Sequence, residues 1–461
     1  MNANYDEFLA RKTPKAIARG LKSTPALSSH LFPFQRHCVE FMLRVGAGGL
    51  FLDTGLGKTL VQLEYCEHAR QAENGMALIL TPLAVAKQIE REAKKFGYDA
   101  RVIRDQSEAR EGINICNYDR LHLIQPEAFG VVSLDEASIL KSFGGRTSRD
   151  LIRAFEHQRF KVAATATPAP NDHMELGQYA EFCNVMQSNE MLSRFFINDT
   201  SVASQNWRLK RHGVHAFWDW MASWCRLAQV PSDLGDKDEG FALPPLQVHR
   251  HRAAESAPTM TGGLFGDEVV SATNLHSIKR ATANNRAQIA AELALSDREP
   301  WVIWCDTDYE SDEILDALDG TKGVVEVRGS MSPERKESGL ESFVDGTARV
   351  MVTKPSVAGF GLNWQHCANT VFVGRSFSYE SWYQAVRRFW RFGQQRAVQV
   401  HLVVAEGEDS IARVIDRKAD DHDEMKRAMR EAMKRNAGKE SATKVAYKPT
   451  VKGKLPSWLT A

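Results

Sequence analysis

A short glycine-containing segment near the N-terminus combines the residue types that bind a nucleoside triphosphate. Gly55-Leu56-Gly57-Lys58-Thr59 follows the apolar run Gly49 to Leu52 and opens a helical pattern, the order that a phosphate-binding loop requires. The glycines let backbone N–H groups approach phosphates, Lys58 would neutralise the β- and γ-phosphate charge, and the Thr59 hydroxyl would ligate Mg²⁺. Leu52 stands where the general pattern has its first glycine.

Two adjacent carboxylates supply a second candidate part of the same site. Asp135 and Glu136 directly follow the apolar run Val131 to Leu134, and therefore lie at the carboxyl end of a predicted strand, where open α/β sheets build sites. Asp135 would hold Mg²⁺ through water, and Glu136 would polarise the attacking water as a general base. A strand followed by Asp-Glu is on its own more often a solvated loop, but the phosphate loop upstream favours the catalytic interpretation.

Both motifs need strands that run into loops at one edge of a sheet, and the chain carries that pattern twice. Short apolar runs alternate with helical stretches, which is typical of parallel α/β structure. In the first half, the predicted strands are Gly49 to Leu52, Met76 to Leu80, Val131 to Leu134 and Lys161 to Ala164, and the predicted helices are Lys58 to Arg70 and Ala84 to Phe96. After residue 300, the predicted strands are Trp301 to Cys305, Val324 to Arg328, Val350 to Thr353, Thr370 to Val373 and Val398 to Val404. The sequence thus predicts an α/β protein of two tandem lobes with parallel sheets.

Five segments follow from these patterns. Residues 1–30 are predicted as an N-terminal extension, 31–184 as a nucleotide-binding first lobe, 185–275 as a linker with an irregular, partly helical insertion, 276–433 as a second lobe and 434–461 as a basic tail. The tail carries seven Lys and Arg residues against one Glu. Such a tail could be merely solvated, or it could track the phosphates of a nucleic acid.

Composition narrows the class of protein. With 461 residues, 43% of them hydrophobic, the chain is long enough for about three domains. Its 59 basic and 58 acidic residues nearly cancel, so nucleic acid would have to bind at local patches. The seven cysteines are scattered singly and the 14 histidines show no ligand spacing, which disfavours a zinc site or a disulfide framework. The start lacks a signal-peptide pattern and no run of about 18 apolar residues occurs, which predicts an intracellular protein without membrane contact.

With its two motifs the chain resembles the superfamily-two helicases, and within them the Swi/Snf-type ATPases. Leu31-Phe-Pro-Phe-Gln35-Arg36 resembles their adenine-reading segment, which implies that Gln35 contacts the base. Thr81-Pro82 and Asn117-Tyr118 resemble first-lobe segments that touch the DNA backbone. The segment from Thr165 to Asp172 resembles the motif that links hydrolysis to movement along DNA. The resemblance implies RecA-like lobes, ATP and Mg²⁺ in the cleft between them, and first-lobe contacts with nucleic acid from Thr81, Asn117, Thr165 and Thr167.

Two further segments extend the resemblance over the second half of the chain. Gly359-Phe-Gly361-Leu-Asn363 resembles motif five, which implies that Asn363 contacts nucleic acid. Gln384-Ala-Val-Arg-Arg-Phe-Trp-Arg-Phe-Gly-Gln394 resembles the Q-A-x-G-R-x-x-R-x-G-Q signature of motif six. Arg388 and Arg391 share a helix face in this string, and from a second lobe they would reach the γ-phosphate as arginine fingers. The alternative is a basic, solvated helix.

The sequence also departs from the family pattern. Ser138 stands where related proteins often have His, Arg387 where the signature has Gly, and Ser356 where Swi/Snf-type motif five commonly has Arg. These departures concern the coupling between the lobes more than the chemistry of ATP. Pro231-Ser-Asp-Leu-Gly235 and Leu243-Pro-Pro-Leu246 additionally resemble segments of compact helicases carried by phages and prophages.

The function that the resemblance implies is ATP-dependent movement along DNA, with duplex favoured. Such a motor would be monomeric, would work in the cytoplasm of a bacterial host cell, and would serve a replication, recombination or nuclease partner. One alternative is a helicase that separates strands of DNA or acts on RNA, and another is a nucleotide-gated binding switch that does not move. Trp218, Trp220 and Trp224 could form a stacking platform for bases, but their helical spacing favours core packing.

Overall fold

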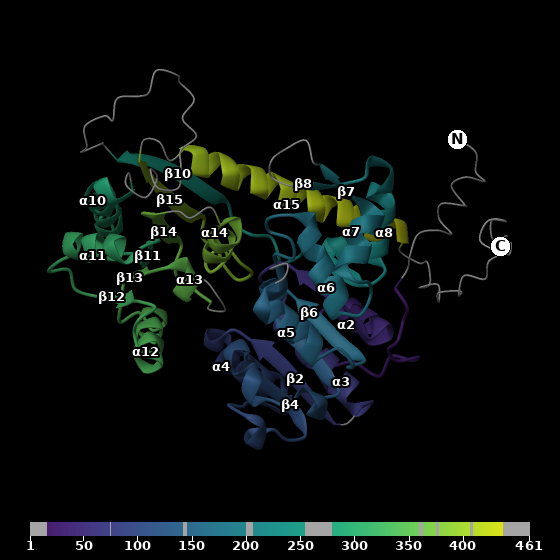
Figure 1. Cartoon of the computed structure of the whole chain (residues 1–461). Coiled ribbons are helices and arrows are strands. Elements are labelled where there is room, and N and C mark those ends of the chain that lie inside the picture. Colours follow the sequence, from purple (N-terminus) through teal and green to yellow (C-terminus); the bar gives the residue numbers. More distant parts are fainter. Residues whose placement is uncertain are drawn as a thin grey trace, which may run out of the picture.

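The chain folds around two parallel sheets, which lie side by side in the computed structural model (Figure 1). The structure describes residues 16–73, 75–141, 145–199, 206–253, 279–358, 363–374, 378–405 and 409–436. We call the part of the chain around the first sheet lobe 1 and the part around the second sheet lobe 2. The predicted α/β fold of two lobes with parallel sheets is confirmed.

Lobe 1 is built on a sheet that has seven strands within the described ranges, in the order β3-β4-β2-β5-β6-β1-β9. The strands are β1 (Ala47–Leu52), β2 (Met76–Thr81), β3 (Ala100–Val102), β4 (Gly112–Asn117), β5 (Val131–Asp135), β6 (Phe160–Ala164) and β9 (Cys225–Ala228). Its helices are α2 (Pro33–Val45), α3 (Lys58–Gln71), α4 (Ala86–Phe96), α5 (Arg146–Ala154), α6 (Leu176–Phe182), α7 (Ser188–Phe195) and α8 (Val214–Ala222). Strands β1, β4, β5 and β6 are buried along their whole length, because apolar side chains cover both faces of this sheet.

Alternate residues of each central strand enter two different apolar cores. In β1, Leu50 and Leu52 pack with α2 and α3 on one face of the sheet, whereas Phe51 packs with α6 and α8 on the other. Packing on both faces thus fixes the last residue of the strand, and the start of the loop that follows, at the carboxyl edge of the sheet.

Lobe 2 has a sheet of six strands in the described part of the chain, in the order β10-β15-β14-β11-β13-β12. The strands are β10 (Leu246–Ala253), β11 (Trp301–Trp304), β12 (Val324–Val327), β13 (Val350–Thr353), β14 (Asn369–Phe372) and β15 (Val398–Ala405). The helices are α10 (Ala283–Leu295), α11 (Asp308–Ala317), α12 (Pro333–Val344), α13 (Pro355–Ala358) and α14 (Tyr379–Val386). Small alanines of α10 let this helix pack closely on one face, and Trp304, Trp364 and Phe389 fill the other.

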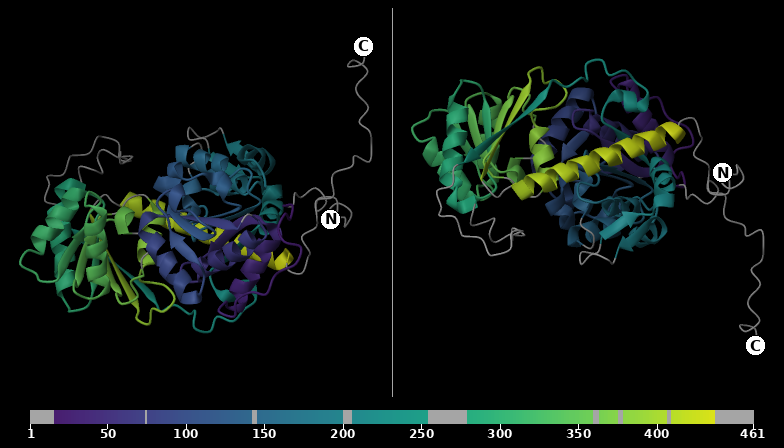
Figure 2. Two further views of the ribbon diagram at one scale, coloured as in Figure 1. Left: turned by 90° about the horizontal axis from the view of Figure 1, so that it is seen from below. Right: turned by 90° about the horizontal axis from the view of Figure 1, so that it is seen from above.

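The last described helix, α15 (Asp409–Asn436), runs from lobe 2 along lobe 1 (Figure 2). Its buried Met425, Met429, Ala432 and Met433 belong to the same apolar core as α6 and α8. Because the helix follows β15 of lobe 2 but buries its apolar face in lobe 1, it connects the two lobes physically. The sequence did not indicate that the last part of the predicted second lobe would pack on lobe 1.

Residues 185–275, predicted as a linker with an insertion, contribute strands to both sheets. Strand β9 pairs with β1 of lobe 1, and β10 pairs with β15 of lobe 2. Both were missed because the charged Arg226 interrupts β9, and because β10, an edge strand, is largely polar and has no apolar run. The antiparallel hairpin β7 (Phe196–Asp199) and β8 (Asn206–Leu209) lies beside α7 and α8. Residues 254–278 lie outside the described ranges, and the five predicted segment boundaries stay predictions.

The tryptophans of the insertion lie inside lobe 1. Trp218, Trp220 and Trp224 are 3%, 1% and 0% exposed, and their rings contact Phe195, Phe217 and one another. The core-packing interpretation of this segment is confirmed. Separately, no helix within the described ranges is long and apolar enough to pass through a membrane.

Candidate active site

The phosphate loop joins β1 to α3 and depends on two glycines in the left-handed region. Gly55 has φ 93° and Gly57 has φ 73°, values that L-residues with a side chain rarely adopt. A Cβ atom at Gly57 would lie 2.3 Å from Nε2 of Gln35, so a side chain at this position would displace the amide group of Gln35. The first turn of α3 has neither a side-chain cap nor an acidic residue, which leaves its N–H groups and dipole available to an anion.

Lys58 and Gln35 both contact the backbone of this loop. The Nζ of Lys58 donates to the carbonyl of Leu52 at 3.0 Å, and burial lowers the pKa of Lys58 although the carboxylates of Glu136 and Asp135 favour its charged form. Gln35 is 3% exposed, and its Nε2 donates to the carbonyl of Leu56 at 3.0 Å. The predicted adenine contact of Gln35 stays a prediction, but its side chain does lie against the loop. Thr59 follows Lys58 in the first turn of α3.

Asp135 is held rigidly at the end of β5. Its Oδ1 accepts from Nε2 of Gln62 on α3 at 3.0 Å, and its Oδ2 accepts from the hydroxyl of Thr81 at 3.1 Å. The phenol of Tyr118 donates to the backbone carbonyl of Asp135 at 2.6 Å. The carboxylate is 6% exposed, and residues from β2, from the turn after β4 and from the helix of the phosphate loop fix it beside that loop. Such a carboxylate suits a hard cation such as Mg²⁺.

Glu136 combines a strained backbone with an unsatisfied carboxylate. Its φ of 49° places a residue with a Cβ in the left-handed region, a cost that proteins usually retain at functional sites. Its Oε2 is buried and has no hydrogen-bond partner among the described residues. Burial raises the pKa of Glu136, with a contribution from Asp135, despite the opposing charges of Lys58 and Arg388. A basic oxygen without a partner is what a group that activates water requires.

Lobe 2 supplies two cations, Arg388 and Arg391, that counter the carboxylates of lobe 1. Burial lowers the pKa of Arg388 to about 9 and that of Arg391 to about 10, and the carboxylate of Glu136 opposes both shifts. Arg388 is 4% exposed, while Nη1 of Arg391 donates to the side chain of Asn363 and its Nε is buried without a partner in the described part of the chain. The structure therefore brings both predicted arginines within electrostatic range of the predicted general base. The prediction that they share a helix face is wrong, because α14 ends at Val386 and both arginines lie in the turn that follows it. The burial of Arg388 also disfavours the alternative of a basic, solvated helix.

Asp53, inside the phosphate loop, was missed in the sequence. Its buried carboxylate forms an ion pair with Arg387 and accepts a hydrogen bond from the phenol of Tyr383, both from lobe 2. Nζ of Lys426 on α15 lies 3.7 Å from Oδ2 of Asp53. Burial would raise the pKa of this carboxyl, but Arg387 and Lys426 outweigh burial and hold it below its usual range. The sequence did contain one indication of this contact: Arg387 stands where the motif-six signature has Gly.

A second buried carboxylate links the lobes near Thr167. Glu380 on α14 is 5% exposed, forms an ion pair with Lys141 and accepts from the hydroxyl of Thr167 at 3.4 Å. Thr165 is also buried, and its Oγ1 accepts from the backbone N–H of Thr167 at 3.1 Å. The segment that resembles the coupling motif thus contacts lobe 2 directly.

Several residues predicted to contact nucleic acid have structural roles in this arrangement. Thr81 is fully buried and donates to Asp135, and Asn117, 8% exposed, caps a short helical turn by accepting from the N–H of Arg120. Asn363 accepts from Arg391. Gly359 and Gly361 of the motif-five segment lie outside the described residues. The side-chain oxygens of these three residues are thus engaged within the protein, and their nucleic-acid contacts stay predictions.

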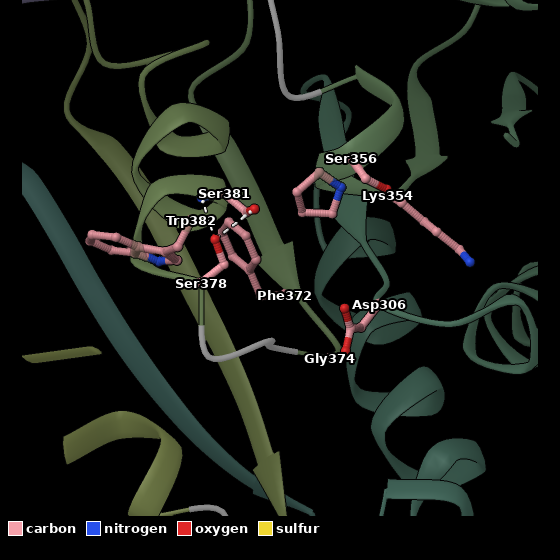
Figure 3. Close-up of a pocket in the computed structure, with 9 residues that line it drawn as sticks. Asp306, Lys354, Ser356, Phe372, Gly374, Ser378, Ser381 and Trp382 are labelled. Carbon is pink, nitrogen blue, oxygen red and sulfur yellow. Dashed lines mark hydrogen bonds between the residues drawn. The ribbon is translucent and has the colours of Figure 1, made fainter. Parts of the chain in front are cut away.

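A polar pocket opens at the carboxyl edge of the lobe 2 sheet (Figure 3). Residues after β11, β13 and β14 and at the start of α14 line it: Asp306, Lys354, Pro355, Ser356, Phe372, Gly374, Ser378, Ser381 and Trp382. The N–H of Ser381 donates to Oγ of Ser378 at 3.2 Å, and Lys354 pairs with Asp308 at 2.9 Å. Strand ends of open parallel sheets are common ligand sites, and this one offers hydroxyl groups, the carboxylate of Asp306 and two aromatic rings.

Comparisons with known proteins agree with this geometry. Residues 285–393, which include the two arginines, match the helicase conserved C-terminal domain. No curated protein matches the chain. Among solved structures, S. cerevisiae Dbp5 bound to RNA and ADP BeF3 is similar at 13% identity, covering 87% of this chain and 93% of that one with a TM-score of 0.56.

Two other solved structures are similar. A fragment assigned to an HsdR subunit of a type I restriction enzyme from Vibrio vulnificus has 16% identity and a TM-score of 0.54, covering 84% of this chain and 66% of that one. The Sulfolobus solfataricus SWI2/SNF2 ATPase core in complex with dsDNA has 18% identity and a TM-score of 0.40, covering 88% of this chain and 95% of that one. The first of these, together with Dbp5, shares the two-lobed fold.

Proposed function

We propose that the chain is an ATP-hydrolysing member of the superfamily-two helicases and that it uses ATP to move along duplex DNA as a Swi/Snf-type translocase. One observation carries the proposal. The phosphate loop and acidic pair of lobe 1 face Arg388 and Arg391 of lobe 2, so a complete set of groups for phosphoryl transfer to water exists only where the lobes meet.

Each residue has a defined chemical task in this proposal. Lys58 and the N–H groups at the start of α3 bind the phosphates, and Glu136 removes a proton from the attacking water. Arg388 and Arg391 stabilise the charge that develops on the γ-phosphate. When bound, Mg²⁺ neutralises phosphate charge, and Thr59 and Asp135 are the residues that would hold it.

The contacts between the lobes offer a route from hydrolysis to movement. Glu380 of lobe 2 touches Thr167 and Lys141 of lobe 1, and Thr167 in turn bonds to Thr165 at the end of β6. A change in the distance between the lobes during the ATP cycle would therefore move the segment that resembles the coupling motif. Alternating grip by the two lobes on one polymer then converts each cycle into a step.

On lobe 2, the polar pocket supports a contact with phosphates. Ser356, Ser378 and Ser381 offer hydroxyl groups, while the ammonium group of Lys354 points away from them and pairs with Asp308 at 2.9 Å (Figure 3). Such groups commonly fix the register of a protein on a nucleic-acid backbone without reading its sequence. The Dbp5 structure, of similar fold, is bound to RNA, which supports a polymer partner without deciding its kind.

The preference for duplex DNA rests on the motif-six string from Gln384 to Gln394, which resembles that of Swi/Snf-type motors. The test measures the ATPase rate with no polymer, single-stranded DNA, duplex DNA and RNA in parallel. We expect the largest stimulation with duplex, ATP-dependent displacement of a third strand from a triplex, and little unwinding of a forked duplex. Robust fork unwinding would instead identify a strand-separating helicase, and a rate indifferent to every polymer would identify a nucleotide switch.

The structure removes one reason to favour strand separation. A wedge that splits a duplex needs an exposed apolar side chain, and the tryptophans considered above for stacking on bases, Trp218, Trp220 and Trp224, are all buried in lobe 1. The aromatic segment therefore offers no device that would separate the strands.

A further inference from the structure

Asp53 places a negative charge inside a loop whose proposed task is to bind a polyanion. It lies between β1 and Gly55, its side chain is 3% exposed, and its Oδ1 accepts from the N–H of Thr54 at 2.6 Å. Phosphate loops work through positive potential from backbone N–H groups and a lysine. A buried carboxylate beside them repels phosphates strongly, because solvent screens little there.

The cations that compensate this charge come from outside lobe 1. Arg387, at the end of α14, pairs with Asp53 and is itself fixed by the phenol of Tyr383 at 3.2 Å and by the carbonyl of Trp390 at 3.0 Å. Lys426 of α15 lies 3.7 Å from Oδ2 of Asp53 and 3.4 Å from the same phenol. Arg387 and Lys426 are 6% and 3% exposed, so the cluster is shielded from water.

The backbone of lobe 2 also lies directly on this loop. A Cβ atom added to Gly55 would be 2.8 Å from the backbone nitrogen of Phe392, five residues beyond Arg387. The ion-pair cluster and this close approach are therefore parts of one contact, through which the arginine-bearing segment rests on the phosphate loop.

We propose that Asp53 is a positioning residue: it holds the arginine segment of lobe 2 and α15 on the phosphate loop before ATP binds, and it competes with the phosphates of ATP for Arg387 and Lys426. The proposal rests on the proposed function, because it takes residues 53–59 as the phosphate site. Asp53 acts as an internal anion that ATP must replace. Binding of ATP and rearrangement of the lobe contact are thereby one event, since the same two cations serve both anions.

If Asp53 has this role, two substitutions should both weaken the contact between the lobes but should change the affinity for ATP in opposite directions. Asp53→Asn keeps the shape of the side chain and removes its charge, so two buried cations lose their anion and the lobes separate more readily. The phosphate site then becomes more positive, and the dissociation constant for ATP falls about tenfold. Arg387→Gln also loosens the lobes, but it leaves Asp53 uncompensated, and the dissociation constant rises about tenfold.

The experiment measures two quantities on the full chain without nucleic acid. One is the dissociation constant of a non-hydrolysable ATP analogue in the presence of Mg²⁺, and the other is the radius of gyration of the nucleotide-free protein from small-angle scattering. Lys426→Gln is a second variant on the cationic side, expected to shift affinity in the direction of Arg387→Gln. The double variant Asp53→Asn/Arg387→Gln should return the affinity towards the wild-type value, since it removes one charge of each sign.

A matched control is the ion pair of Lys87 on α4 with Glu337 on α12, which also joins the lobes but has side chains 64% and 45% exposed. An exposed pair contributes little, so Lys87→Gln should change neither quantity. Lys58→Ala tests the phosphate site by itself and should weaken binding of the analogue.

The outcomes separate this proposal from the proposed function. Opposite affinity shifts, with a larger radius of gyration for both single variants, support the role of Asp53. If Lys58→Ala weakens binding but Asp53→Asn and Arg387→Gln shift affinity in the same direction, or leave the radius of gyration unchanged, the Asp53 proposal is wrong while the ATP site stands. If Lys58→Ala leaves binding unchanged, the assignment of the phosphate site fails and the Asp53 proposal fails with it.

Discussion

The two lobes use the same strand-loop-helix unit for opposite purposes. In lobe 1, the loop after β1 contains glycines with positive φ, and α3 begins without a side-chain cap. In lobe 2, α11 follows β11 and begins with a capping box, in which Oε2 of Glu310 accepts from the N–H groups of Asp306 and Thr307 at 2.8 and 3.0 Å. The helix start that lobe 1 leaves open to an anion is occupied by the protein's own carboxylate in lobe 2.

The comparison shows that a shared fold does not by itself make a nucleotide site. Helix dipole and unpaired N–H groups attract phosphates only where no side chain satisfies them first. Lobe 2 instead contributes cations, Arg388 and Arg391, and buries Glu310 against Arg286 at 2.9 Å. Five predictions test this division of tasks.

Glu136→Gln should have the largest effect on turnover, because it removes the proposed general base of lobe 1 and keeps the shape of the side chain. We expect ATP to bind and persist unhydrolysed, in contrast to Lys58→Ala, which should weaken binding as well. Rapid-quench measurement of product in a single turnover checks this. Hydrolysis by Glu136→Gln at the wild-type rate would assign the base to another residue.

Arg391→Ala, and similarly Arg388→Ala, should lower the hydrolysis rate by roughly 10³-fold, the typical contribution of an arginine finger. Nucleotide affinity should change far less, since the arginines act on charge that develops in the transition state. Steady-state kinetics with saturating polymer separate the two effects. A variant with normal kcat would show that lobe 2 supplies no catalytic group at these positions.

Glu310→Ala should lower the stability of the fold and leave ATP hydrolysis unchanged. Substitutions at the start of α3, in contrast, should change the binding of ATP. Removing this carboxylate leaves Arg286 buried without its partner and uncaps α11, with a cost of about 3 kcal/mol in the free energy of unfolding. Denaturant titration measures the cost. The affinity for ATP at a temperature where the variant is folded should equal that of the wild type, and a specific loss of affinity would place nucleotide chemistry in lobe 2.

Glu380→Gln should weaken communication between the lobes. The substitution removes the ion pair with Lys141 and weakens the contact with Thr167, so stimulation of the ATPase by nucleic acid should fall by about tenfold. The ratio of rates with and without polymer is the measurement, and Lys87→Gln is again the matched control. An unchanged ratio would mean that coupling passes elsewhere.

Deletion of residues 437–461 should have the smallest effect. The cut preserves α15, whose Arg435 pairs with Asp219 of lobe 1 at 2.9 Å, and removes five lysines. If the tail contacts phosphates, the slope of log affinity against log salt should decrease by about 0.9 for each lost contact. An unchanged slope supports the solvated tail, and in either case the ATPase rate without polymer should stay the same.

Most strands and both phosphate-site motifs were predictable, because their signals are local. Observed β2, β5, β6 and β13 begin and end within a residue of the predicted ranges, and α3 begins at the predicted Lys58. A buried parallel strand must be apolar throughout, and a phosphate loop must follow it directly, so both leave contiguous patterns in the sequence. β9, which contains Arg226, and the largely polar edge strand β10 have no contiguous apolar run.

The sequence by itself determined which residues could do chemistry: the loop with Lys58 and Thr59, the pair Asp135 and Glu136, and two arginines at helical spacing. Only the tertiary structure decided which of them meet. Asp53 and Tyr383 are 330 positions apart, and α15 packs on a lobe that the sequence places at the other end of the chain. No local period encodes such contacts, because they arise when two independently formed sheets bury charged and apolar surfaces against each other.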